Sequence, residues 1–277
     1  MHFLSIFLIY AGYLVDYSIN GLLWNETYLK GDVVQVGDLN VYSVGKSALN
    51  FAVIVIYDVR GFNISQTRVF CDRLASEYST RVVMPDFFRG GAAPSRGNLS
   101  AWVSMATNWS RVSNDLTNMA AWLQKNDSTT RIGLIGFCWG GLQVVRACSN
   151  LSSLFFTGVS IHGSSITVTE VSLLKKPMFF IASGTDPALR PNISDAIERA
   201  NPQISQQCQY QTYDNMVHGF ASAGANFSNP ANVAALNDVH LNVTNYFTKV
   251  LNNPAPFLSM NSQLAFFCFC VTYIYVK

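Results

Sequence analysis

The stretch Gly136-Phe137-Cys138-Trp139-Gly140-Gly141 joins two segments with different hydrophobic patterns. Residues 131–135 before it form an apolar run typical of a buried strand, and residues 142–148 after it have the character of a helix. A cysteine flanked by glycines at such a turn is typical of a nucleophile elbow, because glycines let neighbouring backbone approach closely and the helix directs its first amides at the thiol. Cys138 is therefore a candidate nucleophile with thiolate character, and a buried structural cysteine is the alternative.

A nucleophile of this kind needs an orienting acid and a base, which follow it along the chain in that order. Asp186 comes shortly after the apolar run 178–182, so its carboxylate lies in a loop at the end of a predicted strand. His218 follows the alternating segment 210–213, and the chain contains only four histidines. We predict Asp186 as the acid and His218 as the base; Asp214 is the alternative acid, and an ordinary hydrogen-bonded loop histidine is the alternative role of His218.

Strand-like and helix-like segments alternate along the chain, as a mostly parallel α/β sheet requires. The continuous apolar run 51–57 suits a strand that is covered on both faces. The other expected elements are a hairpin at 33–36 and 39–42, a helix with Phe70, Leu74 and Tyr78 on one stripe, strands near 81–84, 155–161 and 208–213, a long helical region ending near Leu123, and a last helix from about Pro230 through Phe247.

Five separated segments carry a pattern that is shared with a known family: VIVIYDVRGF at 53–62, VVMPDFFRG at 82–90, GFCWGG at 136–141, GTD at 184–186 and HGF at 218–220. On these segments the chain resembles the dienelactone hydrolases, the carboxymethylenebutenolidase-like branch of the α/β-hydrolases. The resemblance implies one α/β-hydrolase domain, with a mostly parallel central sheet and helices on both faces. It also implies that Cys138, Asp186 and His218 form a catalytic triad that works without a cofactor.

The resemblance extends to the residues around the triad. It assigns the oxyanion hole to the backbone N–H groups of Val59 and Trp139. Asp58 stands where the best-known members carry a glutamate that holds the resting thiol, so it is predicted as a supporting residue with a shorter reach; capping of the following turn is its alternative role. Ser222 stands where the bacterial lactone hydrolases use an arginine to bind a substrate carboxylate, and dienelactone is therefore not predicted as the substrate.

The expected partner is a small-molecule ester or lactone, which is cleaved through a thioester on Cys138. Arg60 and Arg89 are candidates for a contact with an anionic substrate group, and a solvated charge or a structural ion pair is the alternative for each. The competing function is that of a secreted, non-catalytic binding protein that retains the fold. A thiol redox protein is a weaker alternative, because a resolving cysteine near Cys138 is lacking.

Composition fits a globular enzyme: the chain has 277 residues, of which 49% are apolar and 13% aromatic. Lys and Arg number 18 against 16 Asp and Glu, and the sequence contains neither a basic stripe nor a glycine-rich phosphate motif. Nothing here predicts a nucleic-acid partner. No metal site is predicted either, because Cys268 and Cys270 are too closely spaced in an apolar context.

The two ends differ in composition from the rest of the chain. Residues 3–15 are a mostly apolar run, which is shorter than the roughly 20 residues of a membrane-spanning helix and closer to the core of a secretory signal. We predict a signal peptide at 1–21, the hydrolase domain at 22–253, and a polar-to-apolar tail at 254–277 without an assigned role. A glycolipid-anchor signal is one alternative for this tail, and association with a membrane is expected only through these terminal segments.

Nine Asn-x-Ser/Thr sequons occur, whereas random placement at this composition predicts about three or four. The excess predicts passage through the secretory pathway, to a secreted, lysosomal or membrane-tethered destination. An oxidising compartment would threaten an accessible catalytic thiol, and no disulfide is predicted. Asn63 lies close to the predicted oxyanion loop and is set apart; the candidates for glycosylation are Asn25, Asn98, Asn108, Asn126, Asn150, Asn192, Asn226 and Asn242.

Overall fold

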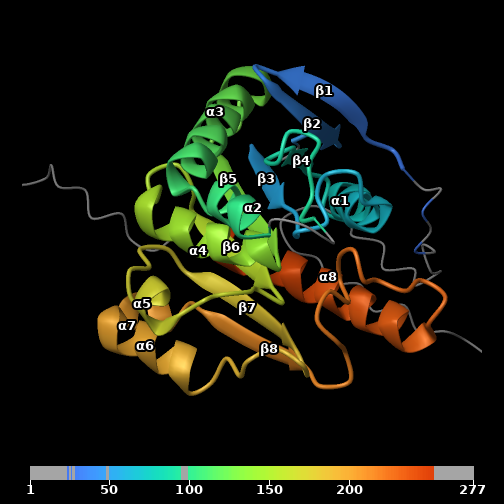
Figure 1. The fold of residues 1–277 in the computed structure, drawn as a ribbon. Coiled ribbons are helices and arrows are strands. Elements are labelled where there is room, and N and C mark those ends of the chain that lie inside the picture. Colours follow the sequence, from blue (N-terminus) through green and yellow to red (C-terminus); the bar gives the residue numbers. More distant parts are fainter. Residues whose placement is uncertain (1–23, 25, 27–28, 48–49, 95–98, 253–277) are drawn as a thin grey trace, which may run out of the picture.

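A central sheet organises the computed structural model, which describes residues 24, 26, 29–47, 50–94 and 99–252 (Figure 1). Within these residues the strand order is β1-β2-β4-β3-β5-β6-β7-β8. The strands β1 and β2 form a hairpin, β2 pairs antiparallel with β4, and the other pairings are parallel. The predicted mostly parallel α/β sheet is therefore confirmed.

The elements follow one another in the expected alternation. The strands are β1 (Asp32–Val36), β2 (Leu39–Val44), β3 (Phe51–Ile56), β4 (Arg81–Pro85), β5 (Arg131–Phe137), β6 (Thr157–Ile161), β7 (Met178–Ser183) and β8 (Gln209–Tyr213). The helices are α1 (Ser65–Glu77), α2 (Leu99–Ala106), α3 (Trp109–Asp127), α4 (Trp139–Asn150), α5 (Val168–Val171), α6 (Asn192–Ala200), α7 (Pro202–Ser205) and α8 (Pro230–Asn252).

Several predictions concern residues outside the described ranges. They are the signal peptide at 1–21, the tail at 254–277 with Cys268 and Cys270, and the sequons at Asn25 and Asn98. These remain predictions, as do the domain boundaries.

Helices cover both faces of the sheet because its central strands are apolar on both faces; all six residues of β3 are buried. On one face, Phe247 of α8 packs against Phe51 of β3, with ring centroids 5.4 Å apart. On the other face, α4 lies so close to β6 that a Cβ atom at Gly158 would overlap Val144. Figure 1 shows α3 and α4 on one side of the sheet and α1 and α8 on the other. The sheet is therefore a buried layer, and its strands end in loops at the edge of the sheet.

Two helices differ from the sequence-based expectation. The long helical region is divided into α2 and α3, because the Asn108 side chain accepts a hydrogen bond from the backbone N–H of Arg111 (3.3 Å) and so caps a new helix. The last helix begins at Pro230 as predicted but continues past Phe247 to Asn252. Neither difference alters the strand ends at which the candidate site lies.

Trp24 ties the segment before β1 to the body of the protein. Its side chain is 5% exposed, and its Nε1 donates to Oδ1 of Asn237 in α8 (2.9 Å). The guanidinium of Arg73 in α1 lies over the indole, 4.2 Å from the ring centroid. The folded body therefore includes residues that precede the hairpin.

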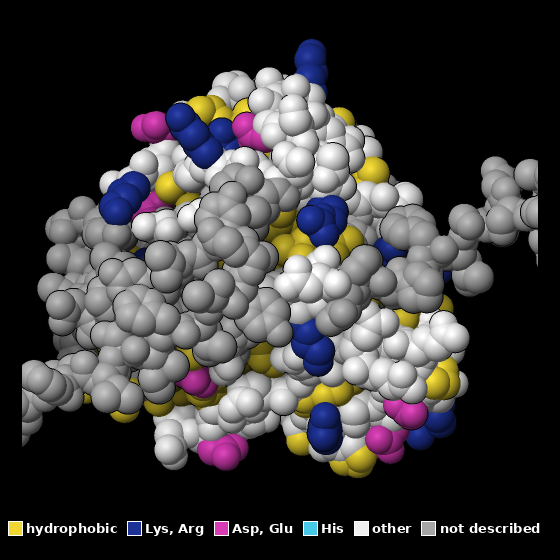
Figure 2. Space-filling model, turned by 180° about the vertical axis from the view of Figure 1, so that it is seen from behind, with side chains coloured by type: hydrophobic (Ala, Val, Ile, Leu, Met, Phe, Trp, Pro, Cys, Tyr) yellow, Lys and Arg dark blue, Asp and Glu magenta, His cyan; other side chains and the backbone are white. Residues whose placement is uncertain are grey.

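The described surface carries dispersed charges. On the face seen in Figure 2, Lys and Arg side chains are scattered among uncharged ones. Within the described ranges, none of the helices combines the length and the apolar character needed to span a bilayer.

Candidate active site

Cys138 occupies a strained position between β5 and α4. Its backbone angles are φ 51° and ψ −112°, a region that residues with side chains rarely adopt. The flanking glycines make the turn possible, since a Cβ atom at Gly136 would overlap the carbonyl of Gly140, and one at Gly140 would overlap the carbonyl oxygen of Ile56. This is the geometry expected of a nucleophile elbow.

The end of β6 and the loop that follows it contact both the backbone and the thiol of Cys138. The Cys138 N–H donates to the carbonyl oxygen of Ile161 (3.2 Å), and the Cys138 carbonyl accepts from the N–H of Ser164 (2.9 Å). The Ser164 hydroxyl lies 3.2 Å from the Cys138 sulfur. The cysteine itself is only 9% exposed. Sequence reasoning missed Ser164, because only the pairing of β5 with β6 brings this loop to the thiol.

Asp186 is fixed in the loop after β7 and binds the imidazole of His218. The backbone N–H and the hydroxyl of Ser183 donate to Oδ2 of Asp186 (2.7 and 2.9 Å). The other carboxylate oxygen, Oδ1, accepts from Nδ1 of His218 (2.5 Å). The backbone N–H of His218 donates to the hydroxyl of Thr185 (2.8 Å). Within the described part of the chain no hydrogen bond joins Asp214 to His218, so the geometry favours Asp186 as the acid.

The three side chains shift one another's pKa values in a consistent direction. The hydrogen bonds with Asp186 and Cys138 raise the pKa of His218 to about 10, against the opposing effect of burial. Burial raises the pKa of Cys138, but its hydrogen bonds with His218 and Ser164 and the charge of the imidazolium lower that pKa by more. The result is a pKa below that of an ordinary cysteine. The arrangement therefore favours the thiolate of Cys138 and the imidazolium of His218 more than ordinary surroundings would.

Val59 and Trp139, whose amides are predicted to form the oxyanion hole, lie in the turn after β3 and at the start of α4. Val59 lies in a turn closed by a hydrogen bond from the N–H of Gly61 to the carbonyl of Asp58 (3.1 Å), and the Val59 carbonyl accepts from Ala93 (2.8 Å). Trp139 is the first residue of α4, where backbone N–H groups have no partner within the helix. No acceptor for either amide is found among the described residues. An oxyanion hole requires amides without an internal acceptor, and both candidates meet this requirement among the described residues.

Asp58 is 5% exposed and joins two loops of the site. Its Oδ1 accepts from the backbone N–H of Arg60 (2.7 Å), which is the turn-capping role considered for it. Its Oδ2 accepts from the hydroxyl of Ser222 (2.5 Å) and the N–H of Ala223 (3.1 Å). The structure thus brings together the two positions at which the sequence departs from the family pattern.

The two candidate arginines have different surroundings. The guanidinium of Arg89 donates twice to Asp115 (2.6 and 2.9 Å) and also to Asp38 (2.9 Å). Its predicted contact with an anionic substrate is therefore not retained, because carboxylates of the protein already occupy it. Arg60 is exposed in the turn that contains Val59, and no hydrogen bond or ion pair engages its guanidinium among the described residues.

His162 backs the imidazole of His218. Its ring is fully buried, with its centroid 5.0 Å from that of His218 and 5.9 Å from that of Phe220. Burial lowers the pKa of His162 to about 3, so this histidine is neutral. Within the described chain neither ring nitrogen has a hydrogen-bond partner. His162 therefore packs as a neutral ring against His218 and Phe220.

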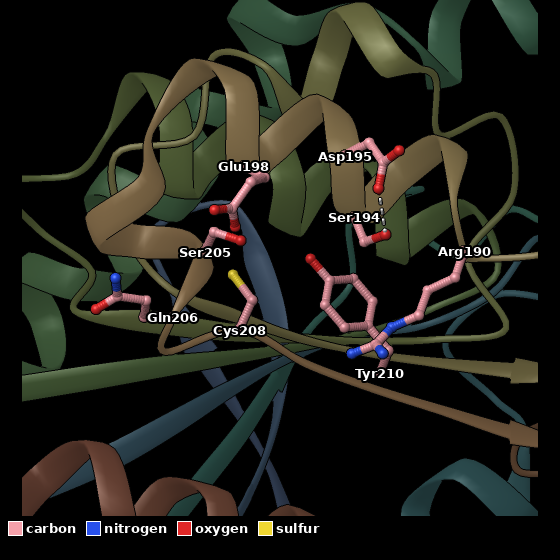
Figure 3. Close-up of a pocket in the computed structure, with 8 residues that line it drawn as sticks. All are labelled: Arg190, Ser194, Asp195, Glu198, Ser205, Gln206, Cys208 and Tyr210. Carbon is pink, nitrogen blue, oxygen red and sulfur yellow. Dashed lines mark hydrogen bonds between the residues drawn. The ribbon is translucent and has the colours of Figure 1, made fainter.

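Two hollows lie beside β8. Figure 3 shows one of about 480 Å³, into which Cys208 and Tyr210 project below α6 and α7. The other, of about 450 Å³, shares Arg190 and Tyr210 with the first and reaches Asp186. Across the described residues, no group of three or more His, Cys, Asp or Glu side chains is placed to hold a metal ion.

Comparisons with known proteins agree with the fold described above. The model of the dienelactone hydrolase family matches residues 39–251. The carboxymethylenebutenolidase homolog of Homo sapiens is 28% identical over 229 residues, which cover 80% of this chain and 91% of the relative. The crystal structure of a dienelactone hydrolase from Anabaena variabilis has a TM-score of 0.53 at 14% identity, with 79% and 97% of the two chains covered. A dienelactone hydrolase-like promiscuous phosphotriesterase from metagenomic libraries has a TM-score of 0.58 at 16% identity, with 79% and 98% covered.

The elbow predicts that a side chain at Gly140 is not tolerated. Gly140→Ala should lower the free energy of unfolding by about 3 kcal/mol or more, because its Cβ would meet the backbone of β3 rather than a movable side chain. Gly37→Ala is the control: Gly37 has φ +60°, and no described atom lies within 4 Å of the place that a Cβ would take there, so strain alone should cost about 1 kcal/mol. Denaturant unfolding of both variants measures the difference. Equal losses would contradict the close approach.

Proposed function

Since the chain belongs to the dienelactone hydrolase family, we propose that it hydrolyses an ester or lactone with Cys138 as its nucleophile. The chain has the α/β-hydrolase fold that its sequence predicts. The single observation that carries the proposal is the hydrogen bond between His218 and Asp186 (2.5 Å), together with the pKa shifts by which His218 and Cys138 favour each other's charged forms.

In the proposed reaction the Cys138 thiolate attacks the carbonyl carbon of the substrate, and a carbon–sulfur bond forms. The amides of Val59 and Trp139 stabilise the oxyanion of the tetrahedral intermediate. The carbon–oxygen bond of the ester then breaks, and the His218 imidazolium gives its proton to the leaving oxygen. His218, now neutral, takes a proton from water, which hydrolyses the thioester and releases the acid. Asp186 keeps the imidazole oriented throughout.

A panel of activated esters and lactones tests the nucleophile. Cys138→Ala should lower kcat/KM by at least about 10³-fold on every compound that the wild type hydrolyses, because the substitution removes the proposed nucleophile. Cys138→Ser should also be slow, since a serine hydroxyl lacks the thiolate character of the native residue. The acyl-enzyme is detected as a mass increase on the peptide that contains Cys138.

Cys208→Ala is the matched control, because burial raises the pKa of Cys208 to about 11 and the residue lies outside the triad. It should retain the wild-type rate. Equal turnover by wild type and Cys138→Ala would contradict the mechanism. An inactive wild type whose Cys138 also fails to react with thiol reagents would favour the non-catalytic binding protein.

We further propose that Arg60 favours substrates with an anionic group. It is exposed, its guanidinium is unengaged among the described residues, and Asp58 fixes its backbone next to the proposed oxyanion hole.

The proposal predicts a selective effect of Arg60→Gln. KM should rise about three- to tenfold for esters that carry a carboxylate, while neutral esters of the same size should be unaffected. Arg190→Gln serves as the control, because the Arg190 guanidinium lies over Tyr210, 4.7 Å from the ring centroid. Steady-state kinetics measure KM for the charged and the neutral ester of each pair. An equal change in KM for both would exclude recognition of charge by Arg60.

We also propose that the chain passes through the secretory pathway and carries N-linked glycans. Among the candidates with described residues, the exposed ones are Asn108, Asn126, Asn150, Asn192 and Asn226. Asn242 differs, because its side-chain amide is half-buried and donates to the Tyr213 hydroxyl (3.3 Å) and to Asp238 (2.9 Å). A glycan on Asn242 would remove at least one of these two bonds, because a glycosylated amide keeps a single N–H.

Expression of the full chain in a secreting eukaryotic cell tests this proposal. Treatment with an N-glycosidase should lower the mass of the protein, and Asn192→Gln should remove the mass of one glycan because Asn192 is exposed at the start of α6. Asn242→Gln should leave the mass of the attached glycans unchanged. A protein whose mass does not respond to the glycosidase would contradict the proposed route.

A further inference from the structure

The loop after β6, residues 162–165, contacts both the backbone and the thiol of Cys138. His162 and Ser165 have positive φ angles of 41° and 59°, which turn the chain back over the elbow. The hydrogen bond from the Ser164 N–H to the Cys138 carbonyl (2.9 Å) fixes the loop to the elbow. These backbone contacts fix the Cα atom of Ser164, so the position of its hydroxyl depends only on rotation about one side-chain bond.

The Ser164 hydroxyl has one partner in the described structure, the Cys138 sulfur at 3.2 Å. No other acceptor there competes for its proton, so the hydroxyl can donate to a thiolate. Ser164 is half-buried, and water competes less for such a hydrogen bond than at an exposed site.

The carboxylate of Asp58 does not take this role. Three donors already bind it, from Arg60, Ser222 and Ala223, and no hydrogen bond joins it to Cys138 in the described structure. Its negative charge raises the pKa of Cys138 and so disfavours the thiolate. Among the described side chains, Ser164 and His218 are those whose hydrogen bonds favour the charged sulfur.

We propose that Ser164 is a further catalytic residue, whose hydroxyl donates a hydrogen bond to the Cys138 thiolate and holds it until the substrate arrives. This inference rests on the proposed function. The hydroxyl keeps its proton throughout. When the carbon–sulfur bond forms, the sulfur becomes a neutral, weak acceptor and the hydrogen bond is released.

The test is the pH dependence of Cys138 alkylation by iodoacetamide, followed by peptide mass spectrometry so that only this cysteine is counted. Ser164→Ala should move the midpoint of the profile upward by about one pH unit, since a hydrogen bond to a charged group contributes roughly that much. Ser164→Thr retains the hydroxyl and should keep the wild-type midpoint. Ser165→Ala is the control, because Ser165 is exposed in the same loop.

The experiment separates two failures, because it needs no substrate. A wild-type midpoint in the range of an ordinary cysteine would contradict the thiolate–imidazolium pair and with it the proposed function. A lowered wild-type midpoint that Ser164→Ala leaves unchanged would overturn only the role of Ser164. An equal rise in Ser164→Ala and Ser164→Thr, with unfolding midpoints like that of the wild type, would show that loop packing and not the hydroxyl controls the thiol.

Discussion

The close backbone approach between β5 and α4 is the constraint on which the site depends. Gly136 and Gly140 carry no side chain, so α4 can start directly against the end of β3. The atoms on the other side of this approach belong to the backbone of the central sheet and cannot move aside. The turn therefore holds Cys138 at φ 51° with the first amide of α4 beside it. All other groups of the site are positioned relative to this thiol.

Parallel pairing brings the remaining groups to the thiol. The carboxyl ends of β6, β7 and β8 meet at one edge of the sheet, where their loops supply Ser164, Asp186 and His218.

The surroundings of Cys138 give its thiol a different pKa from those of other cysteines in the described chain. Burial raises the pKa of Cys71 and Cys148, whereas the donors around Cys138 lower its pKa. Among the described cysteines, thiolate chemistry is thus favoured at Cys138.

Asp58 and Ser222 both differ from the residues that the family pattern has at these positions, and the two side chains are hydrogen-bonded to each other. A carboxylate buried to this degree needs donors, and the small Ser222 supplies one at 2.5 Å from 164 positions away in the sequence. The pair links the loop that carries Val59 to the loop that follows His218. The carboxylate thus supports the geometry of both the proposed oxyanion hole and the base. In the proposed mechanism the Ser164 hydroxyl, and not the Asp58 carboxylate, binds the Cys138 sulfur.

The sequence by itself determined the elements whose signal is local. The elbow is recognised from adjacent glycines, the buried strands from continuous apolar runs, and the order of Cys138, Asp186 and His218 from their places after such runs. Only the tertiary structure decided which side chains meet. Ser164 reaches the thiol from 26 positions away because β6 pairs with β5, and Arg89 is taken up by Asp115 because α3 packs beside the loop after β4. These contacts depend on strand order and helix packing, which bring distant residues together without leaving a pattern among sequence neighbours.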